Sequence, residues 1–365
     1  MKRVRTSELV PGMITYEDVY SYNNQLIVQK GSVLDDNTIT KLEFYSVLSV
    51  RVEDEVVDTG NGEGVSDFHS LPENIPYSER IKATRQFKEF EREFVNNTEA
   101  LKGNLNAILK NHSINTDVLL SSVTNLISKS STSISMFDML HNMRNYDDFT
   151  YVHSMNVSLI CNIFGHWLNL DTDDIQILTL AGLLHDIGKL LVPEEIIKKP
   201  GKLSAGEFNV IKTHTLQGYN ALKDMDIDTR IKAAALMHHE RCDGSGYPLG
   251  YDESKIVDFA KIVAIADVYD AMTAARCYRG PMCPFTVISI FEDEGLQKYD
   301  SRYILEFLNH IGETYMNNRV RLNNGVEGDI IMLNRNLVSR PLIRCTDGSF
   351  INLAEHKDLH IVTLV

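Results

Sequence analysis

Five histidines and two aspartates in the middle of the chain have the residue types of a transition-metal site. They are His153, His185, Asp186, His214, His238, His239 and Asp267. Imidazole and carboxylate ligands together suit first-row metals such as iron, manganese, nickel and zinc. The series contains no thiolate, which argues against a structural zinc site. A single histidine in a helix is more often a packing residue, but a clustered set of this size indicates a metal or catalytic centre.

Successive predicted helices must bring these residues together. The segment 149–315 has a helical pattern at nearly every point, including an amphipathic helix over 173–189 and a long helix over 256–275. On a helix, the adjacent His185 and Asp186 would point about 100° apart, so one could hold a single metal while the other bridges two. Because the ligands come from different helices, we expect them to meet in the core of a helical bundle.

Patterns outside this segment predict further structural units. Phe87, Phe90 and Phe94 fall on one face of a helix, which we expect to begin near an N-cap at Ser78. Strand-like runs mark the first part of the chain, and two hairpin signals, Asn-Gly and Asp-Gly, mark the last. The expected division is a β-rich module (1–57), a linker (58–77), a helical connector (78–146), a catalytic domain (147–318) and a β module (319–365).

Composition limits the classes of partner. The 365 residues exceed one small domain, and 43% of them are hydrophobic, as in ordinary globular proteins. A formal net charge of −14 opposes binding to nucleic acid and to anionic lipid. Five cysteines without a C-x-x-C pair do not predict a disulfide framework. We find no signal peptide and no membrane span, so we expect a cytoplasmic protein without a nucleic-acid partner.

Four motifs follow one another in the segment that carries the histidines. They are Leu184-His185-Asp186-Ile187-Gly188-Lys189, His238-His239-Glu240, Asp243-Gly244-Ser245-Gly246-Tyr247-Pro248, and Ile265-Ala266-Asp267 with Arg276, Tyr278 and Arg279 on the residues that follow. In this order they resemble the HD-GYP branch of the HD phosphohydrolase superfamily. The resemblance covers roughly 147–311, about half of the chain, and rests on long and correctly spaced motifs.

The resemblance implies a mainly α protein: an HD-type helical domain with a helical lead-in, flanked by small β-rich modules at both termini. It implies hydrolysis of cyclic di-GMP at two divalent metal ions, iron or manganese before nickel, magnesium or zinc. Members with a third metal have a glutamate four residues before the histidine that corresponds to His153, and Phe149 stands there instead. The residues that match metal ligands are His185, Asp186, His214, His238, His239 and Asp267, with Asp186 as the bridge.

Cations near the metals would bind and activate the phosphodiester. Two metals neutralise the phosphate and acidify a bridging water, and Asp186 and Lys189 are the predicted catalytic residues. Lys189 lies four residues after His185, on the same face of the expected helix, where its ammonium could contact the phosphate. Arg276 and Arg279 are expected to bind the second phosphate, as arginine matches phosphate oxygens bidentately. His153, Asp270 and Tyr247 are predicted to lie near the site.

Two other interpretations remain open on the sequence. One is an HD-type phosphohydrolase for another nucleotide, such as cyclic GMP-AMP, because no motif specifies the bases. The other is a non-catalytic cyclic di-GMP receptor, which the intact ligand set disfavours. The product could be the linear dinucleotide or GMP. A homodimer, or a protein partner at the GYP loop or the terminal β modules, is compatible with either interpretation.

Overall fold

A computed structural model describes the chain in two compact units, Met1–Val65 and Ser66–Val365. The residues it describes are 2–6, 9–10, 12–20, 26–34, 38–39, 42, 47, 49–53, 77–127, 133–143, 149–199, 201–274 and 282–365. The proposed linker over 58–77 therefore lies almost wholly outside the described residues. Each unit has a hydrophobic core of its own.

The first unit is built from two small antiparallel sheets. β1 (Lys2–Arg5) pairs with β4 (Ser49–Val52), and β2 (Val19–Tyr20) pairs with β3 (Leu26–Val28). Apolar side chains such as Leu34 are buried between them. The predicted β-rich character is confirmed. Most of the short helix expected over 36–44 lies outside the described residues.

The second unit begins with helices that lead into the domain carrying the histidines. Phe87, Phe90 and Phe94 are buried along the longest of these helices, as their spacing predicted. That helix begins at Thr84, whose side chain accepts a hydrogen bond from the Phe87 amide. Ser78 is not an N-cap, because the preceding helix already includes it. The lead-in helices are α2 (Tyr77–Ala83), α3 (Arg85–Asn111), α4 (Thr116–Ile127) and α5 (Ser133–Asn142).

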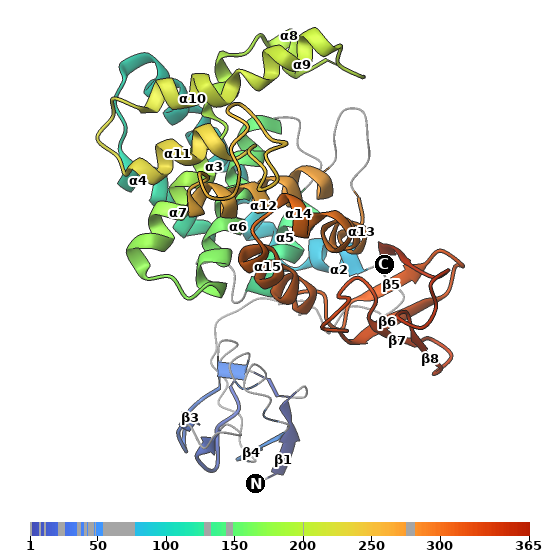
Figure 1. Ribbon diagram of the computed structural model, residues 1–365. Coiled ribbons are helices and arrows are strands. Elements are labelled where there is room, and N and C mark those ends of the chain that lie inside the picture. Colours follow the sequence, from blue (N-terminus) through green and yellow to red (C-terminus); the bar gives the residue numbers. More distant parts are fainter. Residues whose placement is uncertain are drawn as a thin grey trace. The chain divides into compact units, whose positions relative to one another are not determined.

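A bundle of helices follows, in which α6, α7, α11 and α12 pack on one another, as Figure 1 shows in green, yellow and orange. It contains α6 (Phe149–Trp167), α7 (Thr172–Leu184), the 3-10 helix η3 (Ile187–Leu191), α8 (Glu194–Ile197), α9 (Ala205–Lys212), α10 (His214–Leu222), α11 (Thr229–Met237), α12 (Asp258–Thr273), α13 (Pro284–Ile290), η4 (Phe291–Gly295), α14 (Leu296–Lys298) and α15 (Ser301–Glu313). The long helix expected over 256–275 is confirmed as α12. None of the described helices has the length and apolarity that crossing a lipid bilayer requires.

The prediction of an amphipathic helix over 173–189 is wrong in two respects. α7 ends at Leu184, and Asp186 leaves helical geometry with φ −103° and ψ 11° before η3 begins. α7 is also not amphipathic, because consecutive residues from Leu178 to Leu184 are all buried. Helices α4, α6, α11 and α12 surround it, so that opposite faces of the helix are covered. His185 and Asp186 therefore take their directions from a helix end rather than from helical periodicity.

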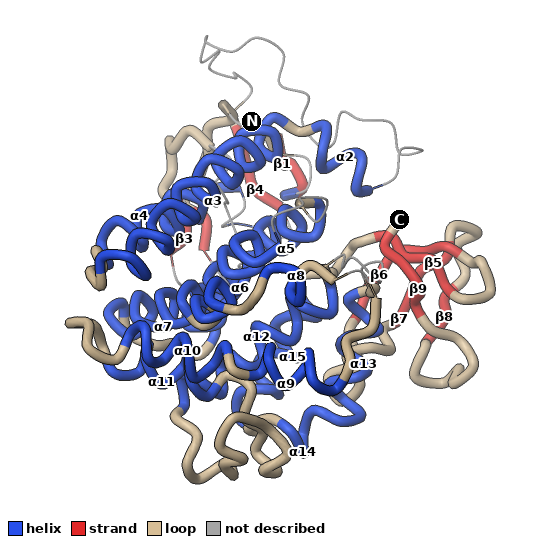
Figure 2. Tube along the Cα trace, turned by 90° about the horizontal axis from the view of Figure 1, so that it is seen from above, coloured by secondary structure: helices blue, strands red, loops and turns tan. Residues whose placement is uncertain are grey.

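The last segment forms one five-stranded antiparallel sheet, red in Figure 2, which packs against the helices. Its strand order is β8-β7-β6-β5-β9, from β5 (Arg319–Leu322), β6 (Glu327–Met332), β7 (Leu342–Cys345), β8 (Phe350–Asn352) and β9 (Ile361–Leu364). Both predicted hairpins are present, with Gly325 and Gly348 at φ 85° and 84°. Buried residues of the sheet join the helical core, so the proposed boundary at 319 separates no independent core. The finer division of 78–365 stays a prediction.

One close backbone contact positions the histidine of α10. A Cβ added at Gly188 would lie 1.9 Å from the carbonyl oxygen of His214 and 2.5 Å from the amide nitrogen of Gly218. No side chain fits into this gap between η3 and α10. The two glycines thus allow the segment that carries Asp186 to approach the segment that carries His214.

We predict that Gly188→Ala lowers the free energy of unfolding by about 1–3 kcal/mol, because an added methyl group must push α10 away from η3. Urea unfolding followed by the fluorescence of Trp167 would measure this change. Gly103→Ala is the matched control: its Cβ meets nothing within 4 Å, and removing a helical glycine should stabilise α3 by roughly 0.5–1 kcal/mol. Equal stability of the Gly188→Ala variant and the wild type would contradict the proposed role of this contact.

Candidate metal centre

The histidines and aspartates predicted to act together do converge in the helical bundle. Most of them occupy helix ends. His185 follows α7, His214 opens α10, and His238 closes α11. Asp228 caps the start of α11, with its side chain accepting a hydrogen bond from the Arg230 amide. His153 and Asp267 project from within α6 and α12.

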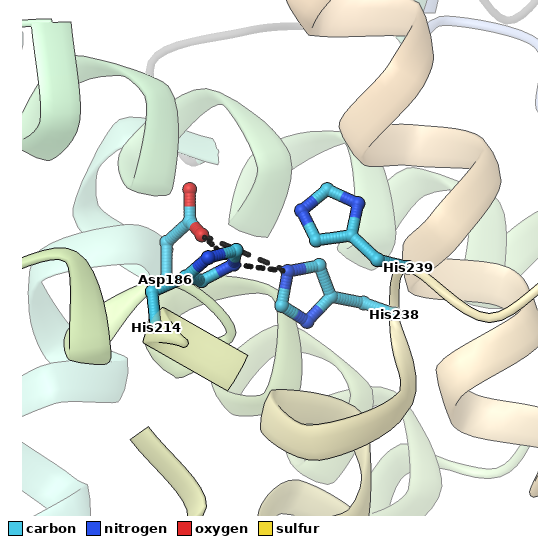
Figure 3. A group of neighbouring side chains, drawn as sticks. All are labelled: Asp186, His214, His238 and His239. Carbon is cyan, nitrogen blue, oxygen red and sulfur yellow. Dashed lines mark hydrogen bonds and ion pairs between the residues drawn. The ribbon is translucent and has the colours of Figure 1, made fainter. Parts of the chain in front are cut away.

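The first group consists of Asp186, His214, His238 and His239, whose candidate ligand atoms all lie within 4.8 Å of one another. Figure 3 shows their side chains turned toward one another. Asp186 Oδ1 lies 3.3 Å from His214 Nε2 and 3.6 Å from His238 Nε2. His239 is the most exposed of the four, with 18% of its side chain accessible. This group could hold one metal ion.

The second group consists of His153, His185 and Asp267, all buried. His153 Nε2 lies 2.9 Å from Asp267 Oδ1, and His185 Nε2 lies 3.9 Å from the same oxygen. The other oxygen of Asp186, Oδ2, lies 3.3 Å from His185 Nε2 and 3.5 Å from His153 Nε2. Each oxygen of Asp186 thus faces a different group, as a carboxylate that bridges two metals would require.

Hydrogen bonds fix the direction of the imidazole lone pairs. The Nδ1 atoms of His185, His214 and His238 lie 2.7, 2.7 and 3.0 Å from the backbone carbonyls of Gly182, Ile211 and Ala234. A carbonyl oxygen only accepts, so Nδ1 carries the proton and Nε2 of the neutral ring presents a lone pair. Metal-binding histidines normally make such a hydrogen bond through the ring nitrogen that does not bind the metal.

The resulting arrangement fits a cation. His214 Nε2 and His238 Nε2 lie 3.2 Å apart, and two lone pairs at that separation repel unless a positive charge lies near both. His185 Nε2 and Asp186 Oδ1 are buried without a hydrogen-bond partner. Unpartnered buried polar atoms are rare and costly. The donor set, nitrogen and oxygen only, suits divalent first-row metals.

His153 makes a second set of contacts that sequence reasoning only partly anticipated. Its Nδ1 lies 2.7 Å from Asp270 Oδ2, and Asn156 donates a 3.0 Å hydrogen bond to Asp270 Oδ1. All three residues are buried. Asp270 therefore orients His153 and does not face the metal groups directly. Asn156 escaped the sequence analysis, although its position three residues after His153 on one helix could have indicated it.

The electrostatics of the site keep its ligands in the states that metals bind. Burial lowers the pKa of His214 to about 3 and lowers the pKa of His238, and burial with the nearby His238 lowers the pKa of His239 well below its usual range. Burial alone would raise the pKa of Asp186, but the charge of Lys189 beside it holds that pKa well below its ordinary value. The hydrogen bond from His153 likewise outweighs burial and lowers the pKa of Asp267. Carboxylates ionised and these imidazoles neutral are the binding forms.

Lys189 lies at the site as predicted, but its position differs from the one that the sequence indicated. It belongs to η3, three residues after Asp186, and its ammonium donates a short hydrogen bond to Asp186 Oδ2. The expected shared helical face with His185 is wrong because the helix ends between them. About a fifth of the Lys189 side chain is exposed, so the ammonium remains within reach of a ligand entering the site.

The loop 243–248 contacts the first group of candidate ligands through Tyr247. The ring of Tyr247 stacks on His239, with centroids 4.7 Å apart and planes at 26°. A Cβ at Gly246 would lie 2.4 Å from the Cα of Glu240, which explains why glycine is needed there. Glu240, for which the sequence analysis predicted no role, is buried and accepts hydrogen bonds from the amides of Leu249 and Tyr251. It holds the loop and is not a metal ligand.

The arginines expected to bind the second phosphate cannot be placed. Arg276 and Arg279, with Tyr278 between them, lie outside the described residues. The assignment of these residues to the substrate, and of each histidine and aspartate to a particular metal, stays a prediction.

Comparison with known proteins identifies the family. The model of the HD domain family matches residues 110–303, more than half of the chain. The chain belongs to the HD domain family. The predicted HD-type domain and mainly helical fold are confirmed, and the four motifs of the HD-GYP branch all lie within the matched residues.

Individual relatives carry names that refer to cyclic dinucleotides. The chain is 42% identical over 146 residues to a 3′3′-cGAMP-specific phosphodiesterase 1 of Vibrio cholerae, which covers 40% of this chain and 34% of the relative. It is 39% identical over 138 residues to a cyclic di-GMP phosphodiesterase of Pseudomonas aeruginosa, with 38% and 33% covered. The chain thus spans about a third of the length of these relatives. Among solved structures, an HDG"Y"P protein of Bdellovibrio bacteriovorus is similar at 16% identity and a TM-score of 0.47, over 86% of this chain and 99% of that one.

The protonation states predict how the stability of the metal-free protein depends on pH. Burial alone would lower the pKa of His153. Its hydrogen bonds to Asp267 and Asp270 have the larger, opposite effect and raise the pKa to about 8. The folded state keeps this proton to higher pH than the unfolded state, so His153 contributes about 2 kcal/mol of stability at acid pH that is lost as the pH rises through 8. At lower pH the unfolded state gains protons that His214, His238 and His239 exclude when folded, so stability falls toward acid. The two effects balance near pH 7 by this arithmetic, so we expect maximal stability at about pH 7.

Urea unfolding between pH 5 and 9 in the presence of a chelator would measure this profile. His153→Gln removes the titrating group and should abolish the fall in stability above about pH 7 while leaving the acid slope. A variant profile parallel to that of the wild type above pH 7 would show that His153 does not carry the proton.

Proposed function

We propose that this chain is a metal-dependent phosphodiesterase that hydrolyses cyclic di-GMP to the linear dinucleotide or to GMP. The observation that carries the proposal is the position of Asp186, buried between two groups of ligand atoms with one oxygen toward each. Two cations spaced by one carboxylate are a recurrent device for the hydrolysis of phosphate diesters. The relatives named as cyclic dinucleotide phosphodiesterases support the substrate class.

The bound metals would supply charge neutralisation at the phosphate and a water acidified enough to give hydroxide near neutral pH. The chain's own residues prepare this chemistry. Asp186 fixes the spacing between the two positions, and the backbone carbonyls behind His185, His214 and His238 hold the lone pairs inward. Asp270 and Asn156 restrain His153 at the edge of the second group.

Lys189 supplies a mobile positive charge beside the reacting phosphate. Its ammonium donates a hydrogen bond to Asp186 Oδ2, and about a fifth of the Lys189 side chain is exposed. With metals held by Asp186, this ammonium would be available to a phosphate oxygen or to the departing ribose 3′-oxygen. A cation positioned where negative charge develops lowers the barrier of phosphoryl transfer.

The finer assignments follow the same proposal. His185, Asp186, His214, His238, His239 and Asp267 act as metal ligands, for two ions that are iron or manganese before nickel, magnesium or zinc. Arg276 and Arg279 bind the second phosphate. The enzyme acts in the cytoplasm, with a homodimer or a protein partner at the GYP loop or terminal β modules as further proposals.

Three relatives favour a second candidate substrate, 3′3′-cyclic GMP-AMP, since these Vibrio cholerae proteins are named for it. Relatives named for cyclic di-GMP match over similar lengths, so cyclic di-GMP remains the first choice. A receptor without activity is disfavoured because every ligand expected on the sequence is present and converges. Product analysis by chromatography on both substrates and on a linear nucleotide distinguishes these candidates.

We predict that Asp186→Ala loses both metals and at least about a thousandfold in kcat, because the bridge holds both ions and positions the attacking water. His239→Ala should lose one metal and turnover with it. Metal content after anaerobic purification and hydrolysis of cyclic di-GMP by the same samples would check both. Asp224→Ala and His356→Ala, at exposed positions, are matched controls. Wild-type turnover by the Asp186→Ala variant would refute the assigned bridge.

Arg276→Ala should behave differently from the ligand variants. Removal of a charge that binds the second phosphate should raise KM roughly tenfold or more and leave metal content and kcat nearly unchanged. Arg335→Ala, an exposed arginine in the C-terminal module, removes the same charge at a distance. If both variants show the wild-type KM, Arg276 does not contact the substrate.

A further inference from the structure

The helices α8 and α9 with the residues between them (194–212), here called the arm, precede His214 of the candidate metal centre. None of the residues of α8 or α9, which the structure describes in full, is buried. Figure 1 shows the two helices extending beside α10. α9 is nevertheless well defined at its start, where Ser204 and Glu207 form a capping box and Lys199 binds Glu207 at 2.7 Å. Its other end runs directly into α10 and His214.

The end of this arm places a lysine between two aromatic rings. Lys212 Nζ lies 4.8 Å from the ring centroid of Phe208 and 5.3 Å from that of Tyr247. Tyr247 stacks in turn on His239, a member of the first metal group. One aromatic ring therefore separates the ammonium of Lys212 from a candidate metal ligand.

Within the part of the chain that the structure describes, Lys212 forms no ion pair at 4.0 Å or less, unlike Lys189, Lys198 and Lys199. Phe208 is 45% exposed, although it is a large apolar side chain beside a polar centre. A cation held only by ring faces can exchange that contact for a charge-assisted hydrogen bond at little cost. Phe208 and Lys212 can therefore bind a ligand that has both a flat ring to stack and a hydrogen-bond acceptor.

We propose that Phe208 and Lys212 form the subsite for a guanine base of the substrate, an inference that rests on the proposed function. Phe208 offers an exposed ring on which a purine can stack. Lys212 donates to O6 and N7, the two acceptors on one edge of guanine. Tyr247 is a positioning residue, because it holds the ammonium beside the metal group.

The chemistry of this subsite discriminates between the two purines. Adenine presents an amino group where guanine presents O6, so a lysine that cannot accept a hydrogen bond faces a donor there. We therefore expect GMP to bind more tightly than AMP at this position. In cyclic GMP-AMP, whose single guanine would occupy the subsite, one of the two phosphodiester bonds is presented to the metals. Water adds at that phosphorus, the ribose 3′-oxygen leaves as an alcohol, and one linear product predominates.

The test is binding of GMP and AMP to the metal-loaded full chain, measured by calorimetry, for the wild type and Lys212→Met. The variant keeps most of the apolar stem and loses the charge. We expect the affinity for GMP to fall roughly ten- to a hundredfold and the affinity for AMP to change little. Lys202→Met is the matched control, because it removes an exposed lysine from the same arm.

Turnover provides the second readout. Lys212→Met and Phe208→Ala should raise KM for cyclic di-GMP, and neither should change hydrolysis of bis(p-nitrophenyl) phosphate, a synthetic diester without a purine. Leu216→Ala controls for the loss of an exposed apolar side chain nearby. If wild-type protein cleaves the synthetic diester but no cyclic dinucleotide, the proposed function fails. Equal loss of GMP and AMP affinity in Lys212→Met, or no loss, overturns the guanine subsite whatever the turnover.

Discussion

The arrangement of this domain depends on one buried carboxylate. Asp186 is 1% exposed, and its oxygens face the Nε2 atoms of four histidines as well as the ammonium of Lys189. Burial of an ionised carboxylate is unfavourable unless opposite charge accompanies it. Lys189 provides one such charge, and the inward lone pairs of neutral imidazoles demand another. The fold therefore creates a position whose electrostatic balance is completed by cations.

Helix ends make this position possible. A side chain within a long helix takes its direction from helical periodicity, but a residue at a terminus can turn away from it, as Asp186 does after α7. Carbonyls in the last turn of a helix can accept hydrogen bonds from nearby side chains, and those of Gly182, Ile211 and Ala234 lie within reach of imidazole Nδ1 atoms. Glycine at positions 188 and 218 then lets the termini approach one another.

The sequence was sufficient to name the residues that cluster and insufficient for their geometry. Residue types and ordered motifs identified all seven members of the two groups, and the hairpin glycines identified the C-terminal sheet. The end of α7 was missed because the run from Ile175 to Leu190 is apolar enough to continue a helix, and only packing on several sides shows that it is not amphipathic. Asn156, Glu240 and Phe208 were missed because their roles depend on neighbours distant in sequence or on exposure. Arg276 and Arg279 remain untested in either direction.

Charge connects the candidate metal centre, the arm and the loop. The net charge of the chain is −14, and a substrate with two phosphates, as proposed, would be repelled by it. Near the described centre, Lys189 is already paired with Asp186, and Lys212 stands one ring away from His239. Two lysines cannot neutralise two carboxylates and a dianion, so divalent cations would have to reverse the sign of the local field before the proposed substrate could bind. Glu240 holds the loop that carries Tyr247, and Tyr247 keeps the ammonium of Lys212 beside the proposed base subsite.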